Sequence, residues 1–584
     1  MALIPFLQNN FGSLNRQIDP SNLQPGQYAL GINVRVRNGG PEPIGLPLDL
    51  TDTLPTFTNL QGIYGFDNFL VVFADGLAWI KNYDDPAPQF TQVPNFQMSP
   101  LVDIIYALEV PASTVNYVRK LASDTSGPVN LSTQYEGAPS AIICQDGINQ
   151  PWLILPDGTA RVSQNYSQWS QSAGNTREYI PIGTFMIFVN NKTYLMVKDT
   201  NDNYTLIASS VSGRPCDFMV NIDTNGDAGG TPGYVAYSVS YTPLTCMSAI
   251  GGSQNQTGGQ GVSFYVGHQS FSYLVIPNYN NTIFGEPTYT NQALFSTGPN
   301  NNFSIADLLG DTALVDASGI RSFNSVLQTR FEGRNAPFSA QIQPFFGDSN
   351  DVNSSIVQTT TAATEWSDYG FFAVQTIYGL GFCIYDTIYQ AWVSLDLFPN
   401  LTSPVVMFAD IKQTGGIREL FFMTEDGHFY QYLAGDTSTA GVYGGDFTPT
   451  GNGVDVKPIQ VQPVFVRVVE SGILELGVFM DSKLITTLTK PIDCDSTVDV
   501  DSFNQYPLQP PFGVSADLTR APSFDLTKFQ QGWKMGFWIT WNFKAMLLLV
   551  QAAGDGVLIK NSLKQQARDY AQYQELLAPK NDTI

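Results

Sequence analysis

Residues Phe69–Ile80 read FLVVFADGLAWI, which is an apolar run, a two-residue Asp-Gly turn and a second apolar run. Asp-Gly tolerates the positive φ angles of a tight hairpin turn, and the flanks are rich in β-branched and aromatic residues. The pattern recurs, with Asp-Gly, Asn-Asn or Ser-Gly at the turn, in Trp152–Val162, Phe185–Val197, Ala313–Phe323 and Leu420–Leu433. The sequence therefore predicts a β-architecture of degenerate repeats, which favours a scaffold or binding surface.

Residues 56–435 contain these hairpins, further strand pairs and almost no helical periodicity. Many short strands with glycine-rich turns predict a sandwich, a barrel or a propeller. Several related hairpins in one domain favour a propeller, because each blade is a small antiparallel meander. We therefore expect an all-β chain with an irregular β-propeller over 56–435, whose uneven spacing differs from an orthodox WD-repeat array.

The rest of the chain divides into four further segments. Residues 1–55 are rich in turn residues and are expected to form an arm with one strand, Asn33–Arg37, that points valines inward and arginines outward. The Gly/Thr-rich stretch 436–457 is expected to be a linker. Alternating apolar and polar residues over 458–555 predict a β-sandwich platform, and 556–584 are expected to form a short C-terminal helix and tail.

Charged residues are few in this chain, and most of them are acidic. The 584 residues include 51 acidic and 28 basic side chains, for a net charge of −23, and only 14% are charged, against about 25% in an average domain. An acidic surface repels nucleic acid and anionic membranes at long range. Such a surface serves solubility, or it lines a conduit that DNA passes without adhering. No basic groove for nucleic acid is predicted.

The five cysteines, at positions 144, 216, 246, 383 and 494, are widely spaced and form no CxxC pair. This spacing argues against a disulfide framework or a structural zinc site and predicts folding in a reducing cytosol. The first residues, MALIPFLQNNFGS, have no basic region and no long apolar run, so no signal peptide is expected. No run reaches the roughly 18 apolar residues of a membrane span.

Few residues invite a catalytic or metal-binding interpretation. Only His268 and His428 occur, and each follows a turn glycine. Asp223 and Asp227 flank Asn225 at the alternate spacing of calcium loops, but the glycine is misplaced and no distal Glu follows, so a polar turn is expected. The sequence therefore predicts no enzyme, with no catalytic, cofactor-binding or metal residues and no cofactor.

Several segments nevertheless resemble a known family. Gly31–Gly45 (GINVRVRNGGPEPIG) is similar to the N-terminal segment of tail nozzle (tail tube or hub) proteins of short-tailed, podovirus-type bacteriophages, with Ile44 in place of the second Pro of the family's turn. Further segments that resemble this family, in the same order, are Leu206–Phe218, Val262–Ile276, Gly310–Phe323, Cys383–Asp396 and Val464–Asp481.

The resemblance implies a structural virion protein. It implies a propeller and a platform sandwich, assembled as a homo-hexameric ring below the portal and adaptor proteins. The ring would be a conduit for genome ejection, would contact passing DNA without sequence specificity, and would dock fibres or spikes. The protein would fold in the bacterial host cytoplasm and reside in the phage tail.

Two alternatives stay open at this stage. One is a receptor-binding virion protein of the fibre-docking or tail-spike type. The other is a glycan-binding or glycan-cleaving propeller, which predicts carboxylates and aromatic rings at the propeller centre. The Asn/Gly/Thr-rich segments Asn278–Asn302 and Asp348–Thr364 are expected to be tip or docking loops.

Overall fold

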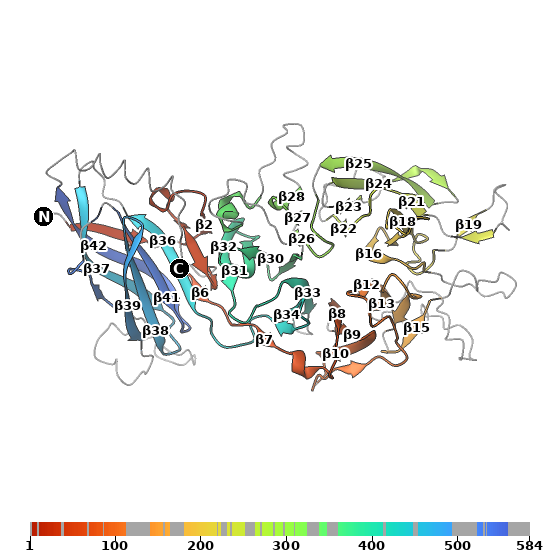
Figure 1. Cartoon of the computed structure of the whole chain (residues 1–584), viewed down its shortest axis with the longest axis horizontal. Coiled ribbons are helices and arrows are strands. Elements are labelled where there is room, and N and C mark those ends of the chain that lie inside the picture. The colour runs from red at the N-terminus through yellow and green to blue at the C-terminus, as the bar shows by residue number, and fades with distance from the viewer. Residues whose placement is uncertain are drawn as a thin grey trace, which may run out of the picture.

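The computed structural model shows an elongated, nearly all-β molecule (Figure 1). It describes residues 3–558, except for 9–10, 37–39, 67–68, 86, 112–139, 156–157, 164–179, 219, 223–230, 234–235, 251–262, 269–270, 284–285, 296–297, 309, 324–337, 347–359, 413–415, 448–453, 493–521, 530–531 and 533. The expected C-terminal helix, like most of 556–584, lies outside this part of the chain.

Seven small antiparallel sheets follow one another along the first three quarters of the chain. Blades one to three are β8 (Leu60–Phe66), β9 (Phe69–Ala74), β10 (Leu77–Asn82) and β11 (Thr91–Gln92); β12 (Tyr106–Pro111), β13 (Ser140–Gln145), β14 (Trp152–Ile154) and β15 (Ala160–Val162); and β16 (Thr184–Val189), β17 (Lys192–Val197), β18 (Leu206–Ser209) and β21 (Ala236–Ser238). A side hairpin, β19 (Val220–Ile222) and β20 (Thr231–Gly233), leaves blade three.

The remaining four sheets continue the series. They are β22 (Cys246–Ala249), β23 (Phe264–His268), β24 (Phe271–Ile283) and β25 (Glu286–Phe295); β26 (Ile305–Leu308), β27 (Asp311–Asp316) and β28 (Gly319–Ser322); β29 (Ala362–Trp366), β30 (Tyr369–Thr376), β31 (Gly379–Asp386) and β32 (Ala391–Leu397); and β33 (Val405–Lys412), β34 (Arg418–Thr424), β35 (Phe429–Gln431) and β7 (Leu48–Asp49). A 3-10 helix, η7 (Ala340–Phe345), lies between blades five and six.

All five hairpins predicted from the sequence are confirmed. They are the pairs β9–β10, β14–β15, β16–β17, β27–β28 and β34–β35. Two of the turns have the positive φ angles that the turn residues predict: Asp75 and Gly76 have φ values of 49° and 76°, and Asn190 and Asn191 have 55° and 58°.

The blades form a closed ring, as in a β-propeller. Each pair of neighbouring blades shares its own apolar core; for example, Phe73 of blade one and Trp152 of blade two belong to one cluster. Further clusters join the next blades in turn. The last cluster joins Phe421 of blade seven to Val72 of blade one, which closes the ring. The chain is therefore an irregular β-propeller, with the expected C-terminal β-sandwich attached.

The ring closes with two special features. The N-terminal strand β7 completes blade seven, because Asp49 pairs with Tyr430 and Leu48 with Gln431 of β35. The innermost strands β8 and β33 approach so closely that a Cβ atom at Gly65 would lie 1.6 Å from the carbonyl oxygen of Asp410. Glycine is required there because no side-chain atom fits.

The sandwich packs two sheets face to face at the other end of the molecule (Figure 1). One sheet is β1 (Leu3–Gln8), β42 (Met546–Leu558), β37 (Val454–Val466) and β40 (Phe524–Asp525); the other contains β36 (Ala440–Phe447), β41 (Met535–Trp541), β38 (Gly472–Met480) and β39 (Lys483–Ile492). Leu474, Leu476 and Val478 alternate along β38 and meet Phe465 and Leu547 of the facing sheet in the core.

The two domains share one sheet. Strand β4 (Leu30–Ile32) of the arm lies between β32 of blade six and β36 of the sandwich, and a nine-stranded sheet runs from β29 to β39. Ile32 pairs with Leu395 on one side and with Gly441 on the other. Because the backbone ladder is continuous, the sandwich is hydrogen-bonded to the propeller and is not tethered by a free linker.

Two expectations about domain boundaries require correction. Residues 1–55 contain more than one strand: β1, β4 and β7 are joined by β2 (Ser13–Leu14), β3 (Gln27–Tyr28), β5 (Val34–Arg35), β6 (Glu42–Pro43) and the 3-10 turns η1 (Pro20–Asn22) and η2 (Thr51–Thr53). Residues 436–457 are not a linker, since they contain β36 and the start of β37. The glycines there serve packing: a Cβ at Gly441 would lie 2.4 Å from the Trp538 ring.

The segment Asn278–Asn302 is also not a loop, because most of it belongs to the β24–β25 hairpin. Its polar residues alternate with ones that pack: Tyr289 contacts Tyr194 and Tyr237 of blade three. Most of the second expected loop, Asp348–Thr364, lies outside the described residues.

We predict that Gly65→Ala lowers the stability of the propeller. The added methyl group would collide with the Asp410 carbonyl and force β8 away from β33, which costs about 1–3 kcal/mol as overpacking of a core does. Thermal unfolding measures the effect. Gly477→Ala is the matched control, since its Cβ would meet no atom closer than 3.3 Å. Equal melting temperatures for the two variants would contradict the close approach.

Candidate functional site

The two histidines lie on different blades. The His428 ring on blade seven has Nδ1 3.0 Å from the carboxylate Oδ2 of Asp49, so it helps to hold β7 in place. His268 ends β23 on blade four and stacks on Phe271 with ring centroids 5.4 Å apart. The structure does not bring the two histidines together, and each makes local contacts beside a turn, as the sequence predicts.

The described residues offer neither a cluster of metal ligands nor an accessible cysteine thiol. They contain no group of three or more His, Cys, Asp or Glu side chains placed to hold a metal ion. The candidate calcium turn at Asp223 and Asp227 lies outside them. The four described cysteines are buried and form no disulfide with one another, and burial raises the pKa of the Cys144, Cys246 and Cys383 thiols, which suppresses the reactive thiolate.

Aromatic side chains meet at one end of the propeller axis. Tyr106 begins the innermost strand of blade two, and its ring lies parallel to that of Phe303, just before blade five, with centroids 6.3 Å apart and planes 5° apart. Phe185 of blade three meets Tyr106 edge to face at 4.6 Å. Blades two and five are not neighbours, so this contact crosses the centre of the ring. We call Tyr106, Phe185 and Phe303 the axial plug.

Arg418 of β34 forms ion pairs with carboxylates on the innermost strands of blades six and seven. Arg418 lies 2.7 Å from Oδ2 of Asp410 and 3.6 Å from Oε2 of Glu365. Burial, which alone would lower the pKa of Arg418, is outweighed by these two carboxylates, and the pKa is raised. Glu365 and Asp410 therefore share one charged partner within the protein, whereas the two carboxyl groups of a glycosidase flank the bond that is cleaved.

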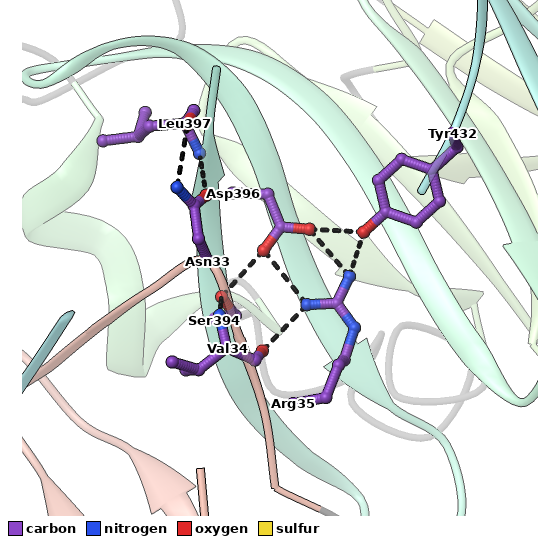
Figure 2. A network of polar contacts seen from close by, with 7 residues as sticks. All are labelled: Asn33, Val34, Arg35, Ser394, Asp396, Leu397 and Tyr432. Carbon is purple, nitrogen blue, oxygen red and sulfur yellow. Dashed lines mark hydrogen bonds and ion pairs between the residues drawn. The ribbon is translucent and has the colours of Figure 1, made fainter. Parts of the chain in front are cut away.

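A network of polar contacts lies where the arm meets blade six (Figure 2). The Arg35 guanidinium donates two parallel hydrogen bonds to the Asp396 carboxylate, from Nη1 at 3.0 Å and from Nη2 at 2.7 Å. Tyr432 of blade seven donates to the same carboxylate at 2.6 Å and also contacts Nη2. Asp396 is fully buried, so this pair is shielded from solvent and from salt. We call Arg35, Asp396 and Tyr432 the arginine clasp.

Neighbouring groups complete the clasp. Ser394 donates to Asp396 Oδ1 at 2.8 Å and accepts from the Val34 amide at 3.1 Å. Asn33 has a positive φ of 54°, and its side-chain amide donates to Leu397 O and accepts from Leu397 N. Burial would lower the pKa of Arg35, but the Asp396 charge outweighs it and the pKa is raised. The arginine therefore stays charged inside the protein.

Sequence reasoning placed Arg35 in solvent, and the structure corrects this. The alternation of Val34 and Arg35 is real, but the side of β5 that carries Arg35 faces the buried Asp396, together with the rings of Tyr369 and Phe371. No sequence signal joins residues 361 positions apart. A charged residue within the strand 391–397 was the only available hint of a buried ion pair.

A buried ion pair within the sandwich also reaches a half-exposed carboxylate of the arm. Lys534 is only 6% exposed, and its Nζ lies 2.8 Å from Oδ2 of Asp446 and 3.7 Å from Oδ1 of Asp19. Asp19 caps η1 by accepting from the Ser21 amide at 2.9 Å. The arm is therefore fastened at both domains.

Comparisons with known proteins show no family. No protein-family model and no curated protein matches the chain. Solved structures with weak similarity include Saccharomyces cerevisiae Sqt1 (8% identity, 69% of this chain, 99% of that chain, TM-score 0.34), BBS1N in complex with ARL6DN (10%, 67%, 97%, 0.33) and the N-terminal domain of Nup159 (10%, 69%, 99%, 0.22). The assignment of the propeller therefore rests on the strand order and blade cores described above.

Among the described residues, no helix has the length and apolar character needed to cross a membrane.

We predict that breaking the arginine clasp destabilises the whole molecule. Arg35→Ala leaves the Asp396 charge buried without its partner, which costs about 3–5 kcal/mol. Urea unfolding measures the loss. Arg467→Ala is the control, because Arg467 is half-exposed and lies 3.4 Å from Glu42 at the surface, where a pair contributes about 0–1 kcal/mol. Replacing both charges, as in Arg35→Met with Asp396→Leu, should cost less than Arg35→Ala; a larger loss for the double variant would count against a charge penalty.

Proposed function

We propose that this chain is a structural, non-enzymatic subunit of the tail of a short-tailed bacteriophage. In this proposal it is a nozzle component of the virion, several copies of which, six by the resemblance, surround a conduit for genome ejection. Its partners are further copies of itself, portal or adaptor proteins, and fibres or spikes. It folds in the host cytoplasm before assembly.

The observation that supports this proposal best is the union of the two domains. The propeller and the sandwich share a nine-stranded sheet, and the buried Arg35–Asp396 pair fixes the arm to blade six beside their junction. A ring subunit has to pass load from one neighbour to the next without bending between its domains. A continuous hydrogen-bonded ladder provides that stiffness, and a propeller joined to a platform sandwich is the architecture that the resemblance implies.

The axial plug bears on where a conduit would lie. Tyr106 and Phe303 stack across the propeller centre, so the axis of a single propeller is too narrow at that end for a nucleic acid. The conduit of this proposal therefore lies between copies. At −23 per copy, its acidic surroundings would keep phosphates from adhering.

The alternative of a glycan-cleaving propeller receives less support. Aromatic rings do lie at the centre, but two of the carboxylates on the innermost strands, Glu365 and Asp410, are paired with Arg418. A third, Asp307 of blade five, has its pKa raised by burial and by the charge of Asp311. Glu365 and Asp410 therefore hold an arginine of the protein itself, whereas the two carboxyl groups of a glycosidase flank the bond that is cleaved.

Native mass measurement and electron-microscopy class averages of the purified protein test the proposal. We expect rings of several copies around an open centre, and the same ring in images of virions at the tail. A stable monomer that hydrolyses a chromogenic glycoside would refute the structural role. Strong binding of the isolated protein to host cells, without ring formation, would favour a receptor-binding role instead.

A further inference from the structure

Most sheet edges in the described part of the chain are short or covered. The outermost strands of blades one, two, three and five have 2, 3, 3 and 4 residues. The arm strands β4 and β7 cover the outer edges of blades six and seven. Short and covered edges are the usual defence against unwanted strand pairing. The longest strands at the end of a sheet in the described part of the chain are β25 in blade four and β39 in the sandwich, each with 10 residues.

Strand β39 differs from β25 in exposing large apolar side chains. Leu484 and Ile485 are 56% and 41% exposed. Leu484 pairs with Phe479, which lies on the outer face of β38, and Trp538 of β41 lies on that same face. The outer face of the sandwich therefore carries an apolar stripe, Trp538, Phe479 and Leu484, that runs to the open edge. Apolar residues gathered at an edge that has no strand partner among the described residues indicate an interaction site.

The sign of the charge on this edge narrows the choice of partner. Strand β39 (KLITTLTKPI) has two lysines and no acidic residue, in a chain with a net charge of −23. Two β39 strands paired antiparallel would bring Lys483 of one close to Lys490 of the other, and like charges opposite each other destabilise a strand pair. The edge therefore fits an acidic partner better than its own duplicate.

We infer that β39 of one copy of this chain pairs with β25 of a second copy. Strand β25 (EPTYTNQALF) has the same length, one acidic residue and no basic residue. The two strands lie in different domains, one in the sandwich and one in the propeller (Figure 1). A contact between two different surfaces is heterologous, and repeated contacts of this kind produce a closed ring or an open filament.

Lysine and proline on edge strands can also serve as protection. In β39 these residues stand at the ends, at Lys483, Lys490 and Pro491, and leave residues 484–489 without a charge or a proline. In β25 the proline is the second residue, Pro287, and residues 288–295 follow without another. Each strand therefore keeps an uncharged stretch long enough for several backbone hydrogen bonds. This inference rests on the self-assembly in the proposed function, but not on the identity of the particle.

The first test is the mass distribution of the full chain by light scattering. The double variant Leu484→Asp with Ile485→Asp should weaken self-association at least about tenfold, because it places two carboxylates on an edge that has to lose its water in the contact. The matched control is Leu101→Asp, since Leu101 is 89% exposed on a propeller loop. Thermal unfolding verifies that the variants are folded, as expected for exposed positions.

The second test detects the β39–β25 contact directly and does not depend on weakened self-association. In a Cys494→Ser background, Ile485→Cys and Thr290→Cys are introduced into separate batches, and the two batches are mixed with a short bismaleimide. A cross-linked dimer that needs both new thiols supports the inference; the four described native cysteines are buried. Rings that form without this cross-link, or that the Asp variants leave intact, would overturn the β39–β25 contact and leave the proposed function standing. A wild-type chain that stays monomeric would overturn both.

Discussion

The ion pair between Arg35 and Asp396 is the interaction on which the rest of this structure depends. It lies where three parts of the chain meet: the arm, blade six and, through Tyr432, blade seven. A buried ion pair contributes little to stability by comparison with an apolar replacement, but a lone buried charge is very costly. The clasp therefore contributes mainly to the specificity with which the arm adopts one register. The arm is accepted in one register only, the one that gives Asp396 its arginine, and that register also places β4 between β32 and β36.

The same arm explains how a ring and a sandwich become one body. Within about fifty residues it adds β1 to the sandwich, β4 to the junction and β7 to blade seven. Each of these strands is short and pairs with a segment hundreds of positions later in the sequence. Loop closure over such distances costs entropy that the contacts of each pairing have to offset. Stiffness at the junction is thus a property of the completed fold, which agrees with the load-bearing role that we propose.

Local features of this fold were predictable from particular residues. The Asp75-Gly76 and Asn190-Asn191 turns, with β-branched and aromatic flanks, indicated their hairpins because turn conformation and strand propensity act over a few neighbouring positions. The prediction of a linker over the glycine-rich stretch 436–457 was wrong, because glycine permits flexibility and close packing alike. The Trp538 ring that occupies the space beside Gly441 comes about a hundred residues later. The axial plug was equally hidden, since Tyr106, Phe185 and Phe303 belong to three separate blades.

The sequence by itself determined that this protein is built of short antiparallel hairpins with an alternating C-terminal sandwich, and that its histidines and cysteines form no familiar motif. These properties follow from turn chemistry and from alternation along single strands. Only the tertiary structure decided that Arg35 points inward, that β7 closes the ring and that β4 joins the two domains. The physical reason is that the group opposite a charge, or opposite a strand edge, decides whether that charge or edge is buried and paired or left in solvent. Here that group comes from a remote part of the chain, at Asp396, at Tyr430 and at Gly441.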